Sequence, residues 1–513
     1  MLDTRSAGIL LHPTSFPAHA GIGDLGPAAY EFIDFLASAR QGLWQILPLN
    51  PVGIGNSPYS STSAFAGNIL LLSLERLADR GMISHKRVAS LNAGQGRVDY
   101  ARVVREKLPL LQEAAASFLR DACSEHRARF DQFVAANSWW LEDFVLFEAL
   151  RLRYQQRSWN TWPHEFAHRE PQAMAAIREE LCDELARARF LQFAFFEQWR
   201  ALHAYSRSKS VQIIGDVAIF VSYDSADVWT HPDIFRLDPD SLEPECVAGV
   251  PPDAFSETGQ RWGNPLYRWE ELKKTGYDWW VKRMRWALQS CDIIRLDHFR
   301  GFQQYWEIPN SELTAVHGRW VDGPGEDLFL VLREKLGELP FIAEDLGVIT
   351  PDVYALRDRM QMPGMRVLQF GFGDPGAHIY LPHRYEANTV VYTGTHDNDT
   401  TLGWWKSCSE EERKFAGALL GDAGDGINWS MVRLAQSSTA NLCVVPLQDV
   451  LSLGSEARMN VPSFGDGNWA WRYSPGALQP KLAQKLATLA EVTDRQPSCD
   501  QQGNGEAGEN FAA

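Results

Sequence analysis

The chain has 513 residues, of which 45% are hydrophobic and 22% are charged, an ordinary composition for a globular protein. Its formal net charge of −16 argues against a surface for nucleic acid or anionic membranes, and no block of Lys and Arg occurs. The seven cysteines are scattered without a CxxC pair, so neither a disulfide framework nor a zinc site is indicated. Without a signal-peptide pattern or a run of 18 apolar residues, the sequence predicts a soluble, cytoplasmic protein.

The first fifty residues predict a strand, an amphipathic helix and a second strand, at 7–12, 27–41 and 43–49. The region after them is mostly helical by pattern. Its clearest part is 180–205, where apolar and aromatic side chains recur every three or four positions. We interpret about 75–205 as a largely helical insertion and not as a separately functioning domain.

Beyond residue 205, apolar runs of strand length alternate with helical patterns. These runs are 211–221, 293–296, 340–343, 365–370, 389–392 and 442–447. Continuous apolar strands with helices between them predict parallel strands whose outer face is covered. Together with the two N-terminal strands they make eight units, the number of an α/β fold of the (β/α)8 TIM barrel type. An open doubly wound sheet is the alternative.

Polar and acidic side chains follow most of these predicted strands. They are Asp216, Asp297, Glu344, Asp345, Gln369, His396, Asp397, Asn398, Asp399, Gln448 and Asp449. Active sites of (β/α)8 barrels lie at the carboxyl ends of the strands. Because several carboxylates in one cleft repel one another and lose solvation, a purely structural origin of the whole group is disfavoured. For Asp345 and Asp399 individually, a role as turn cap or support stays open.

The segment 291–301 contains the pair on which the functional interpretation is built. Ile293 and Ile294 predict a buried strand, and Arg295 and Asp297, two positions apart, project to the same side of it. A guanidinium beside a carboxylate favours the ionised form through charge and hydrogen bonds. Such an Asp is suited to act as a nucleophile. A structural ion pair is the alternative that this segment alone leaves open.

An Asp beside an Arg, a Glu on the next strand and an Asp two strands further suit retaining glycosyl transfer. One carboxylate attacks the anomeric carbon, while a protonated carboxyl group gives its proton to the leaving oxygen. The hydrophobic segment 341–343 before Glu344 predicts a raised pKa that keeps this group protonated near neutral pH. His396 and Asp397 are suited to bind sugar hydroxyls.

A metal site is the main competing use of such side chains, since His298, His396 and several Asp are potential ligands. However, no pair of His shows a recognised metal-ligand spacing. The sequence also contains no nucleophilic Ser elbow and no phosphate-binding loop. We therefore expect no catalytic metal.

Several stretches resemble the ordered motifs of the amylase-like barrel enzymes, namely Asp216–Val221, Arg295–Gly301, Ala343–Gly347 and Gly394–Asp399. More narrowly, the chain resembles the 4-α-glucanotransferases called amylomaltase or disproportionating enzyme, glycoside hydrolase family 77. This narrower resemblance rests on Ser57–Tyr59, Gly249–Pro265, His298–Gly301, Arg458–Pro462 and Gly467–Trp469. It covers residues from about 5 to about 490, and the 249–265 segment is highly specific.

The resemblance implies roles for individual residues. Asp297 is expected to be the nucleophile, Glu344 the acid/base and Asp397 the stabiliser of the transition state. The expected substrate-binding residues are Tyr59, Asp216, Asp253, Trp262, Arg295, His298, His396 and Asn468. Residues around 249–262 are expected to form a loop that arches over the glucan cleft. The family uses no organic cofactor, and this sequence adds no motif for one.

The predicted organisation is one catalytic (β/α)8 barrel domain over 1–490. It contains the helical insertion at about 75–205 and an active-site loop at about 249–265. Because residues 491–513 include almost no apolar side chains, they are expected to form a disordered C-terminal tail.

The predicted activity is that of a 4-α-glucanotransferase, which passes a segment of an α-1,4-glucan to the 4-hydroxyl of an acceptor glucan or glucose. A hydrolase of the same barrel and a catalytically dead glucan-binding protein are the alternatives. The expected partners are α-1,4-glucans and malto-oligosaccharides, with no nucleic acid and no membrane. The protein is expected to be a monomer or a weak homodimer.

Overall fold

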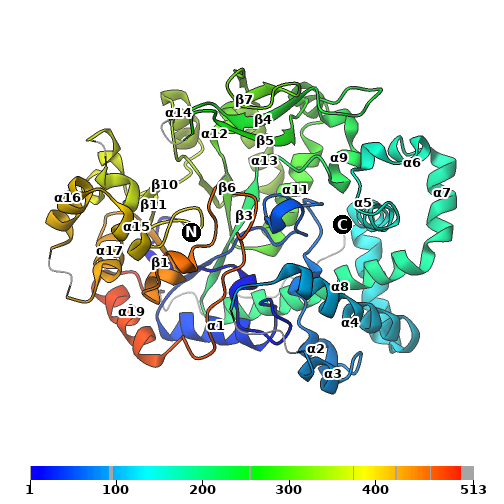
Figure 1. The fold of residues 1–513 in the computed structure, drawn as a ribbon, viewed down its shortest axis with the longest axis horizontal. Helices are drawn as coiled ribbons and strands as arrows, with labels where there is room; N and C mark the ends of the chain where they lie inside the picture. The colour runs from blue at the N-terminus through cyan, green and yellow to red at the C-terminus, as the bar shows by residue number, and fades with distance from the viewer. Residues whose placement is uncertain are drawn as a thin grey trace.

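The computed structural model describes residues 2–91, 96–253, 256–373, 375–421, 424–462 and 464–497. Its centre is a closed barrel of parallel strands in the spatial order β1, β12, β11, β10, β9, β6, β3, β2 (Figure 1). The strands are β1 (Ser6–Leu10), β2 (Leu43–Gln45), β3 (Gln212–Ala218), β6 (Ile293–Asp297), β9 (Phe341–Ala343), β10 (Gly364–Val367), β11 (Thr389–Tyr392) and β12 (Leu442–Pro446). These are the predicted strands, so the (β/α)8 fold class is confirmed and the open doubly wound sheet is excluded.

The register of the barrel strands brings functional side chains to one rim. Asp216 of β3 pairs with Arg295 of β6. On the other edge of β6, Leu296 pairs with Ala343, so Glu344 follows β9 beside the end of β6. Because the strands are parallel, all of their carboxyl ends lie at the same end of the barrel.

Helices follow most of the barrel strands and cover their outer face. They are α1 (Pro27–Ser38), α9 (Ala226–Thr230), α10 (Trp269–Lys274), α11 (Asp278–Ser290), α12 (Arg300–Gln303), α13 (Glu326–Leu336), α14 (Pro351–Arg359), α15 (Thr401–Ser407), α16 (Glu410–Leu420), α17 (Ile427–Gln436), α18 (Leu447–Val450) and α19 (Pro480–Val492). Between β10 and β11 lie the 3-10 helices η6 (Leu368–Phe372), η7 (Pro375–Tyr380) and η8 (Pro382–Arg384). Helix α1 is an example of an amphipathic helix that covers the barrel: Phe32, Phe35 and Leu36 are buried on one face, and Pro27 is the first residue of its first turn. Among the described residues, no helix is long and apolar enough to cross a membrane.

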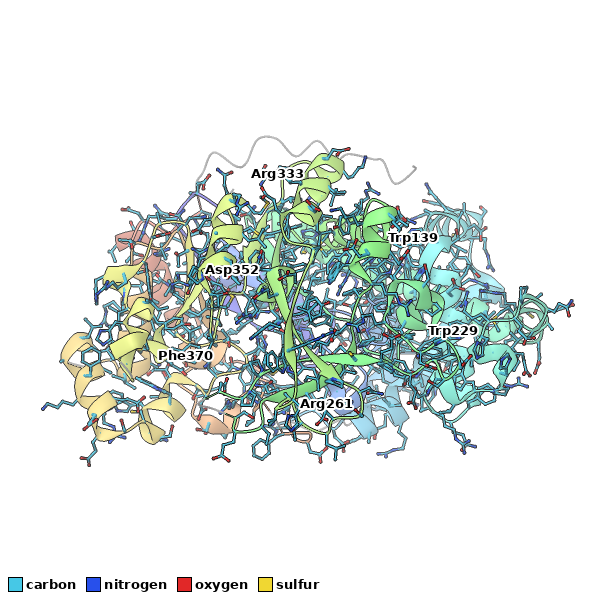
Figure 2. The ribbon with its side chains drawn as sticks, turned by 90° about the horizontal axis from the view of Figure 1, so that it is seen from above. Trp139, Trp229, Arg261, Arg333, Asp352 and Phe370 are labelled. Carbon is cyan, nitrogen blue, oxygen red and sulfur yellow. The ribbon has the colours of Figure 1, made fainter. Side chains whose placement is uncertain are left out.

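A group of helices lies between β2 and β3, in the range where the pattern predicts a helical insertion. They are α2 (Leu74–Asp79), α3 (His85–Ala89), α4 (Tyr100–Asp121), α5 (Ser124–Arg153), α6 (His164–Ala167), α7 (Pro171–Glu180) and α8 (Cys182–Ser208). Helix α8 packs against both α4 and α5, and the stacked rings of Phe118 and Phe190 lie 4.4 Å apart. The helices extend the molecule to one side, so that Trp139 of α5 and Phe370 lie on opposite sides of Figure 2. One hydrophobic core runs through the barrel and this group.

A four-stranded antiparallel sheet, which sequence patterns did not indicate, lies beside the barrel at the top of Figure 1. Its order is β5 (Gln260–Pro265), β4 (Cys246–Val250), β7 (Gln304–Pro309), β8 (Arg319–Asp322). The expectation of a loop over 249–265 is therefore wrong for both ends of the segment, which are strands. Glycine is required at 249 because a Cβ there would collide with the carbonyl oxygen of Gln260 on the paired strand. Phe255 of the expected loop lies outside the described residues.

The C-terminal segment also differs from expectation at its start. Residues 491–497, expected as part of a disordered tail, lie against the barrel, and Arg495 is fully buried. Its guanidinium donates to the backbone carbonyls of residues 6, 436, 438, 440 and 441, at 2.6 to 3.3 Å. The sequence of this segment does not predict that it is anchored, because the burial of Arg495 depends on backbone carbonyls of other segments and not on apolar side chains of its own. The rest of the expected tail, 498–513, lies outside the described residues.

We predict that Arg495→Met destabilises the protein by about 1–3 kcal/mol, because five buried carbonyls each lose one charged donor, although Arg5 still donates to three of them. Thermal unfolding followed by circular dichroism would measure this as a lower Tm. The control is Arg433→Met on α17, where an exposed guanidinium pairs with the exposed Asp425. A Tm change in Arg495→Met no larger than that of the control would contradict the anchoring role.

Candidate active site

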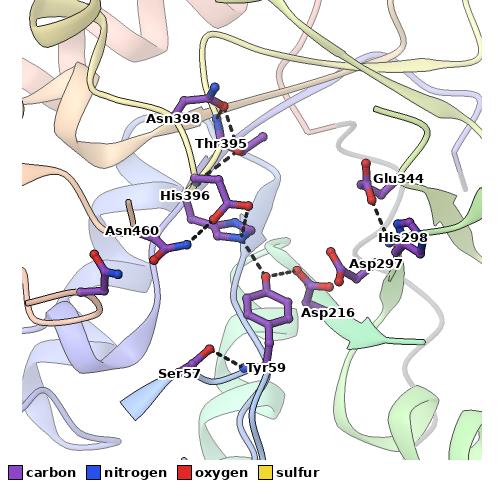
Figure 3. A network of polar contacts seen from close by, with 12 residues as sticks. Ser57, Tyr59, Asp216, Asp297, His298, Glu344, Thr395, His396, Asn398 and Asn460 are labelled. Atoms are coloured by element: carbon purple, nitrogen blue, oxygen red, sulfur yellow. Dashed lines mark hydrogen bonds and ion pairs between the residues drawn. The ribbon is translucent and has the colours of Figure 1, made fainter. Parts of the chain in front are cut away.

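The predicted catalytic side chains meet at the carboxyl ends of neighbouring barrel strands (Figure 3). Around the barrel they are Asp216 on β3, Arg295 and Asp297 on β6, Glu344 after β9, and His396 and Asp397 after β11. The loop after β2 brings Tyr59 to the same place, where its hydroxyl contacts Asp216 and His396. Residues far apart in the chain therefore form one polar cluster.

Arg295 is the buried centre of this cluster. One of its terminal nitrogens lies 2.8 and 2.7 Å from the two carboxylate oxygens of Asp216. The same nitrogen lies 2.9 Å from Oδ1 of Asp297. The guanidinium is almost inaccessible, whereas 29% of the Asp297 side chain is exposed. Asp297 is thus held by a fixed positive charge and is still accessible to solvent, as a nucleophile requires.

Asp216 is the buried hydrogen-bond partner of Arg295 and Tyr59. Its side chain is completely enclosed, and the Tyr59 hydroxyl donates to Oδ2 at 2.8 Å. Burial raises the pKa of Asp216 to about 6, although the charge of Arg295 opposes the shift. The sequence-based expectation made Asp216 a substrate-binding residue. In the structure its oxygens contact Arg295 and Tyr59, and a contact with substrate stays a prediction.

Glu344 lies in a different environment from Asp297. Its Oε2 accepts the backbone N–H of His298 at 2.7 Å, and its Oε1 accepts that of Leu346 at 2.9 Å. Burial raises the pKa of Glu344 to about 7, with the charge of Arg295 opposing the shift and that of Asp297 adding to it. The predicted protonation near neutral pH therefore agrees with the structure. An acid with this pKa can both give and accept a proton under physiological conditions.

His298 contacts both Glu344 and Trp262 of the antiparallel sheet. Its backbone has a φ of 52°, a left-handed conformation in which its N–H points at Glu344. Burial lowers the pKa of its imidazole to about 3, so the ring is neutral. Trp262 of β5 meets this ring edge-on at 4.8 Å and is 39% exposed. Both side chains, expected to bind substrate, thus lie together beside Glu344.

The other side of the site is formed by His396 and Asp397. Nε2 of His396 lies 3.0 Å from the Tyr59 hydroxyl and 3.4 Å from Oδ2 of Asp397. The rings of Tyr59 and His396 stack at 5.3 Å, and Trp469 packs against both. The Asp397 side chain is 46% exposed, which leaves its carboxylate accessible to solvent.

Two residues that sequence reasoning did not assign hold Asp397 in place. The amide of Asn460 donates to Oδ1 of Asp397 at 2.6 Å, and Arg458 donates to its backbone carbonyl at 2.7 Å. Asn460 also donates its backbone N–H to the carbonyl of His396. The only signal for them in the sequence is the motif Arg458–Pro462, which carries part of the family resemblance but implies no role for its individual members.

Two further residues expected to bind substrate are engaged locally. Both ends of the Asn468 amide bond the backbone of its own loop, at Val461 and Phe464. These bonds fix the shape of the loop, and the expected contact of Asn468 with substrate stays a prediction. Asp253 is exposed at the turn between β4 and β5, where its carboxylate accepts the N–H of Ser256 at 2.8 Å.

The described residues contain no group of three or more His, Cys, Asp or Glu side chains arranged to hold a metal ion. What they do contain is two adjacent carboxyl groups in opposite environments. Asp297 faces a guanidinium, whereas Glu344 is half-buried and has a pKa raised to about 7. A nucleophile beside a proton donor is the arrangement of retaining glycosyl transfer.

Comparison with known proteins gives consistent matches over the whole chain. A family model described as 4-alpha-glucanotransferase matches residues 11–479. A 4-alpha-glucanotransferase from Thermus thermophilus is 50% identical, over 96% of this chain and 99% of its own length. The chloroplastic/amyloplastic 4-alpha-glucanotransferase of Solanum tuberosum is 44% identical, over 96% of this chain and 86% of its own length.

Solved structures show the same similarity. Amylomaltase from Streptococcus agalactiae, in complex with acarbose, has a TM-score of 0.93 at 37% identity and covers 96% of this chain and 100% of its own. Amylomaltase from Corynebacterium glutamicum has a TM-score of 0.77 at 19% identity, covers 96% of this chain and 76% of its own, and is similar in fold.

The environment of Glu344 predicts a pH-dependent effect on stability. Its pKa is raised from 4.5 to about 7 in the folded protein, so the native state holds this proton more tightly than the unfolded state does. The stabilisation is complete below about pH 4.5 and is lost as the pH rises to about 7. We predict that the change in unfolding free energy caused by Glu344→Gln is about 1–3 kcal/mol more favourable at pH 8 than at pH 5. The Gln amide nitrogen cannot accept the N–H that one carboxylate oxygen accepts, but this loss is the same at both pH values.

Urea unfolding at the two pH values measures this difference. Glu270→Gln on α10, where the side chain is exposed, controls for the loss of a carboxyl group in general. A change in stability for Glu344→Gln that is the same at pH 5 and pH 8 would show that the native site does not disfavour the charged form.

Proposed function

The chain belongs to the 4-alpha-glucanotransferase family, and from this premise we propose that three carboxyl groups of the barrel rim carry out the transfer. The enzyme is a hexosyltransferase that passes a segment of an α-1,4-glucan to the 4-hydroxyl of an acceptor glucan or glucose. In the proposal, Asp297 is the nucleophile, Glu344 the acid/base and Asp397 the stabiliser of the transition state. The observation that carries it is the contrast between Asp297 and Glu344 at neighbouring strand ends.

In the first step, an oxygen of Asp297 attacks the anomeric carbon of the donor glucan. The bond from this carbon to the glycosidic oxygen breaks, and the proton of Glu344 moves to that oxygen, so the reducing-end fragment leaves as an alcohol. The pKa of about 7 supports Glu344 in this role, because near neutral pH a large fraction of the carboxyl group is protonated and its deprotonation requires little free energy. Arg295, already charged and in place, needs no rearrangement as charge moves on Asp297.

In the second step, the deprotonated Glu344 takes the proton from the 4-hydroxyl of the acceptor. The acceptor oxygen attacks the anomeric carbon, and the ester bond to Asp297 breaks. Two inversions at the same carbon retain its configuration. Glucose is released when the donor is a short malto-oligosaccharide.

Asp397 and His396 are proposed to bind hydroxyls of the sugar ring at the point of cleavage. The accessible carboxylate of Asp397, held by Asn460, supports this role, because a fixed acceptor favours the distorted ring of the transition state. The proposal for the sugar-binding side of the cleft also includes Tyr59, as the partner that orients His396.

Trp262 is proposed to favour sugar over water as the acceptor. Its exposed indole stands beside His298 and therefore near Glu344, where an acceptor sugar would approach. Stacking of the acceptor on this ring would orient the 4-hydroxyl and displace water. Asp253, at the turn of the same hairpin, is proposed to bind acceptor hydroxyls.

The organisation and setting of the enzyme are also proposals. We propose that residues 1–490 act as a single catalytic domain, supported by the core shared between the barrel and the helices at about 75–205. The enzyme is proposed to be cytoplasmic, to act on free glucans as a monomer or weak homodimer, and to use no nucleic acid, membrane or cofactor. The net charge of −16 supports the absence of nucleic-acid binding.

We predict that Asp297→Asn and Glu344→Gln each lower kcat on maltotriose by about 10³-fold or more, since each removes a group that makes or breaks a bond. The wild-type enzyme should produce glucose together with a ladder of longer glucans. Asp352→Asn, an exposed carboxylate on α14, is the control and should retain its activity. Turnover within tenfold of wild type for either active-site variant would remove that residue from its proposed role.

We further predict that Trp262→Ala raises the ratio of hydrolysis to transfer by about three- to tenfold. An aromatic contact is worth about 0.5–1.5 kcal/mol beyond the area it buries, so one ring biases the partition without inverting it. Glucan ladders compared with reducing-end release give the ratio. Trp320→Ala is the matched control, because Trp320 belongs to the same sheet, is 37% exposed and lies under Arg300. An equal change in both variants would trace the effect to the sheet and not to an acceptor contact.

A further inference from the structure

A small cavity lies on the inner side of His396, between the turn that follows β1 and the loop that follows β11. Its volume is about 30 Å³. His12 and Ser15 line it from the first segment, Thr395 and His396 from the second, and Leu47 and Met459 add apolar walls. None of the roles proposed above uses His12 or Ser15.

Three buried polar atoms of this lining have no hydrogen-bond partner anywhere in the described part of the chain. They are Nδ1 of His12, Oγ of Ser15 and Nδ1 of His396. The three residues are only 6%, 1% and 6% exposed. Buried polar atoms in native proteins are almost always paired, and an internal water molecule is the usual partner where protein groups are out of reach. Three such atoms around one cavity therefore point to a shared ligand with hydrogen-bonding capacity on several sides.

The contacts of Nε2 of His396, on the side of the ring away from the cavity, determine whether the ligand must donate to Nδ1 or accept from it. The hydroxyl of Tyr59 has one proton, which it donates to the carboxylate of Asp216. Its oxygen can therefore only accept from Nε2 of His396, 3.0 Å away. Oδ2 of Asp397, 3.4 Å from the same nitrogen, is an acceptor as well. Nε2 thus carries a proton, and in an imidazole with a single proton the other nitrogen, Nδ1, presents a lone pair that needs a donor.

We propose that one water molecule occupies this cavity, bridges His12, Ser15 and Nδ1 of His396, and thereby holds His396 in its Nε2–H tautomer. The volume suits one water, which needs about 10–15 Å³ and two to four polar partners. The water donates one proton to Nδ1 of His396 and exchanges its remaining hydrogen bonds with His12 and Ser15. Burial lowers the pKa of His12 to about 3, so its ring stays neutral and adds no charge behind the active site.

His12 and Ser15 become positioning residues, because they act on the sugar only through the water and His396. This consequence rests on the sugar-binding role proposed for His396. Without the water, Nδ1 has no donor, the Nε2–H tautomer is no longer favoured, and the ring can turn its donor away from the cleft.

Ser15→Ala and His12→Phe test the proposal. The first removes one partner of the water, and the second places an apolar ring where the imidazole stands. Thr14→Val is the matched control: Thr14 belongs to the same 3-10 turn, η1 (Pro13–Ser15), and is buried with an unpaired hydroxyl, but it does not line the cavity. Thermal unfolding of each variant checks that it is folded. If His12→Phe does not fold, the comparison of Ser15→Ala with Thr14→Val decides the question.

Two readouts are required, the kinetics on maltotriose and the tautomer of His396 from ¹⁵N–¹H correlation spectra of protein labelled at its histidines. We expect a single Nε2–H form in the wild type and a mixture of forms in Ser15→Ala and His12→Phe. We expect kcat/KM to fall about tenfold in these two variants and less than twofold in Thr14→Val, the loss of about one hydrogen bond.

An Nδ1–H form in the wild type would overturn the proposal, and so would equal losses in Ser15→Ala and Thr14→Val. Unchanged tautomers in both cavity variants would overturn it as well. A change of tautomer without a change in kcat/KM would support the water site and contradict the role proposed for His396 in sugar binding, so the two failures can be told apart.

Discussion

The site depends on one buried guanidinium between two carboxylates. Asp216 and Asp297 lie on adjacent strands, and their negative charges would repel each other. The Asp216 side chain is fully enclosed, so water does not screen this repulsion on its side. Arg295 lies between them and makes both charges tolerable. From Asp216 the contacts continue through Tyr59 and His396 to Asp397. The proposed nucleophile and the proposed stabiliser are therefore joined by one continuous chain of polar contacts.

Much of this arrangement can be predicted from sequence, because it follows local rules. Apolar runs of strand length with helical patterns between them predict the barrel, since each parallel strand must be buried on both faces. The alternation of side chains along a strand predicts that Arg295 and Asp297 share one side. The apolar residues 341–343 before Glu344 predict the raised pKa, because desolvation by burial is its largest cause.

What could not be predicted depends on contacts between distant segments. The antiparallel sheet of β4, β5, β7 and β8 is built from strands of only four to six residues, too short to show a clear periodicity in the sequence. Asn460 acquires its role only because its loop folds back onto Asp397. Asn468 resembles a sugar ligand in sequence, yet its amide is used by backbone groups four to seven residues away. Arg495 is polar in a polar segment, and only the barrel end provides the carbonyls that bury it.

The central claim is that the glycosyl group is carried covalently on Asp297, and mass spectrometry can test it directly. The Glu344→Gln variant would be mixed with an α-maltosyl fluoride, whose leaving group departs without an acid, so the first step proceeds while the second lacks its base. We expect a maltosyl adduct on the peptide that contains Asp297 and none in an Asp297→Asn, Glu344→Gln double variant. An adduct on another carboxylate, or fluoride release with an inverted product and no adduct, would contradict it.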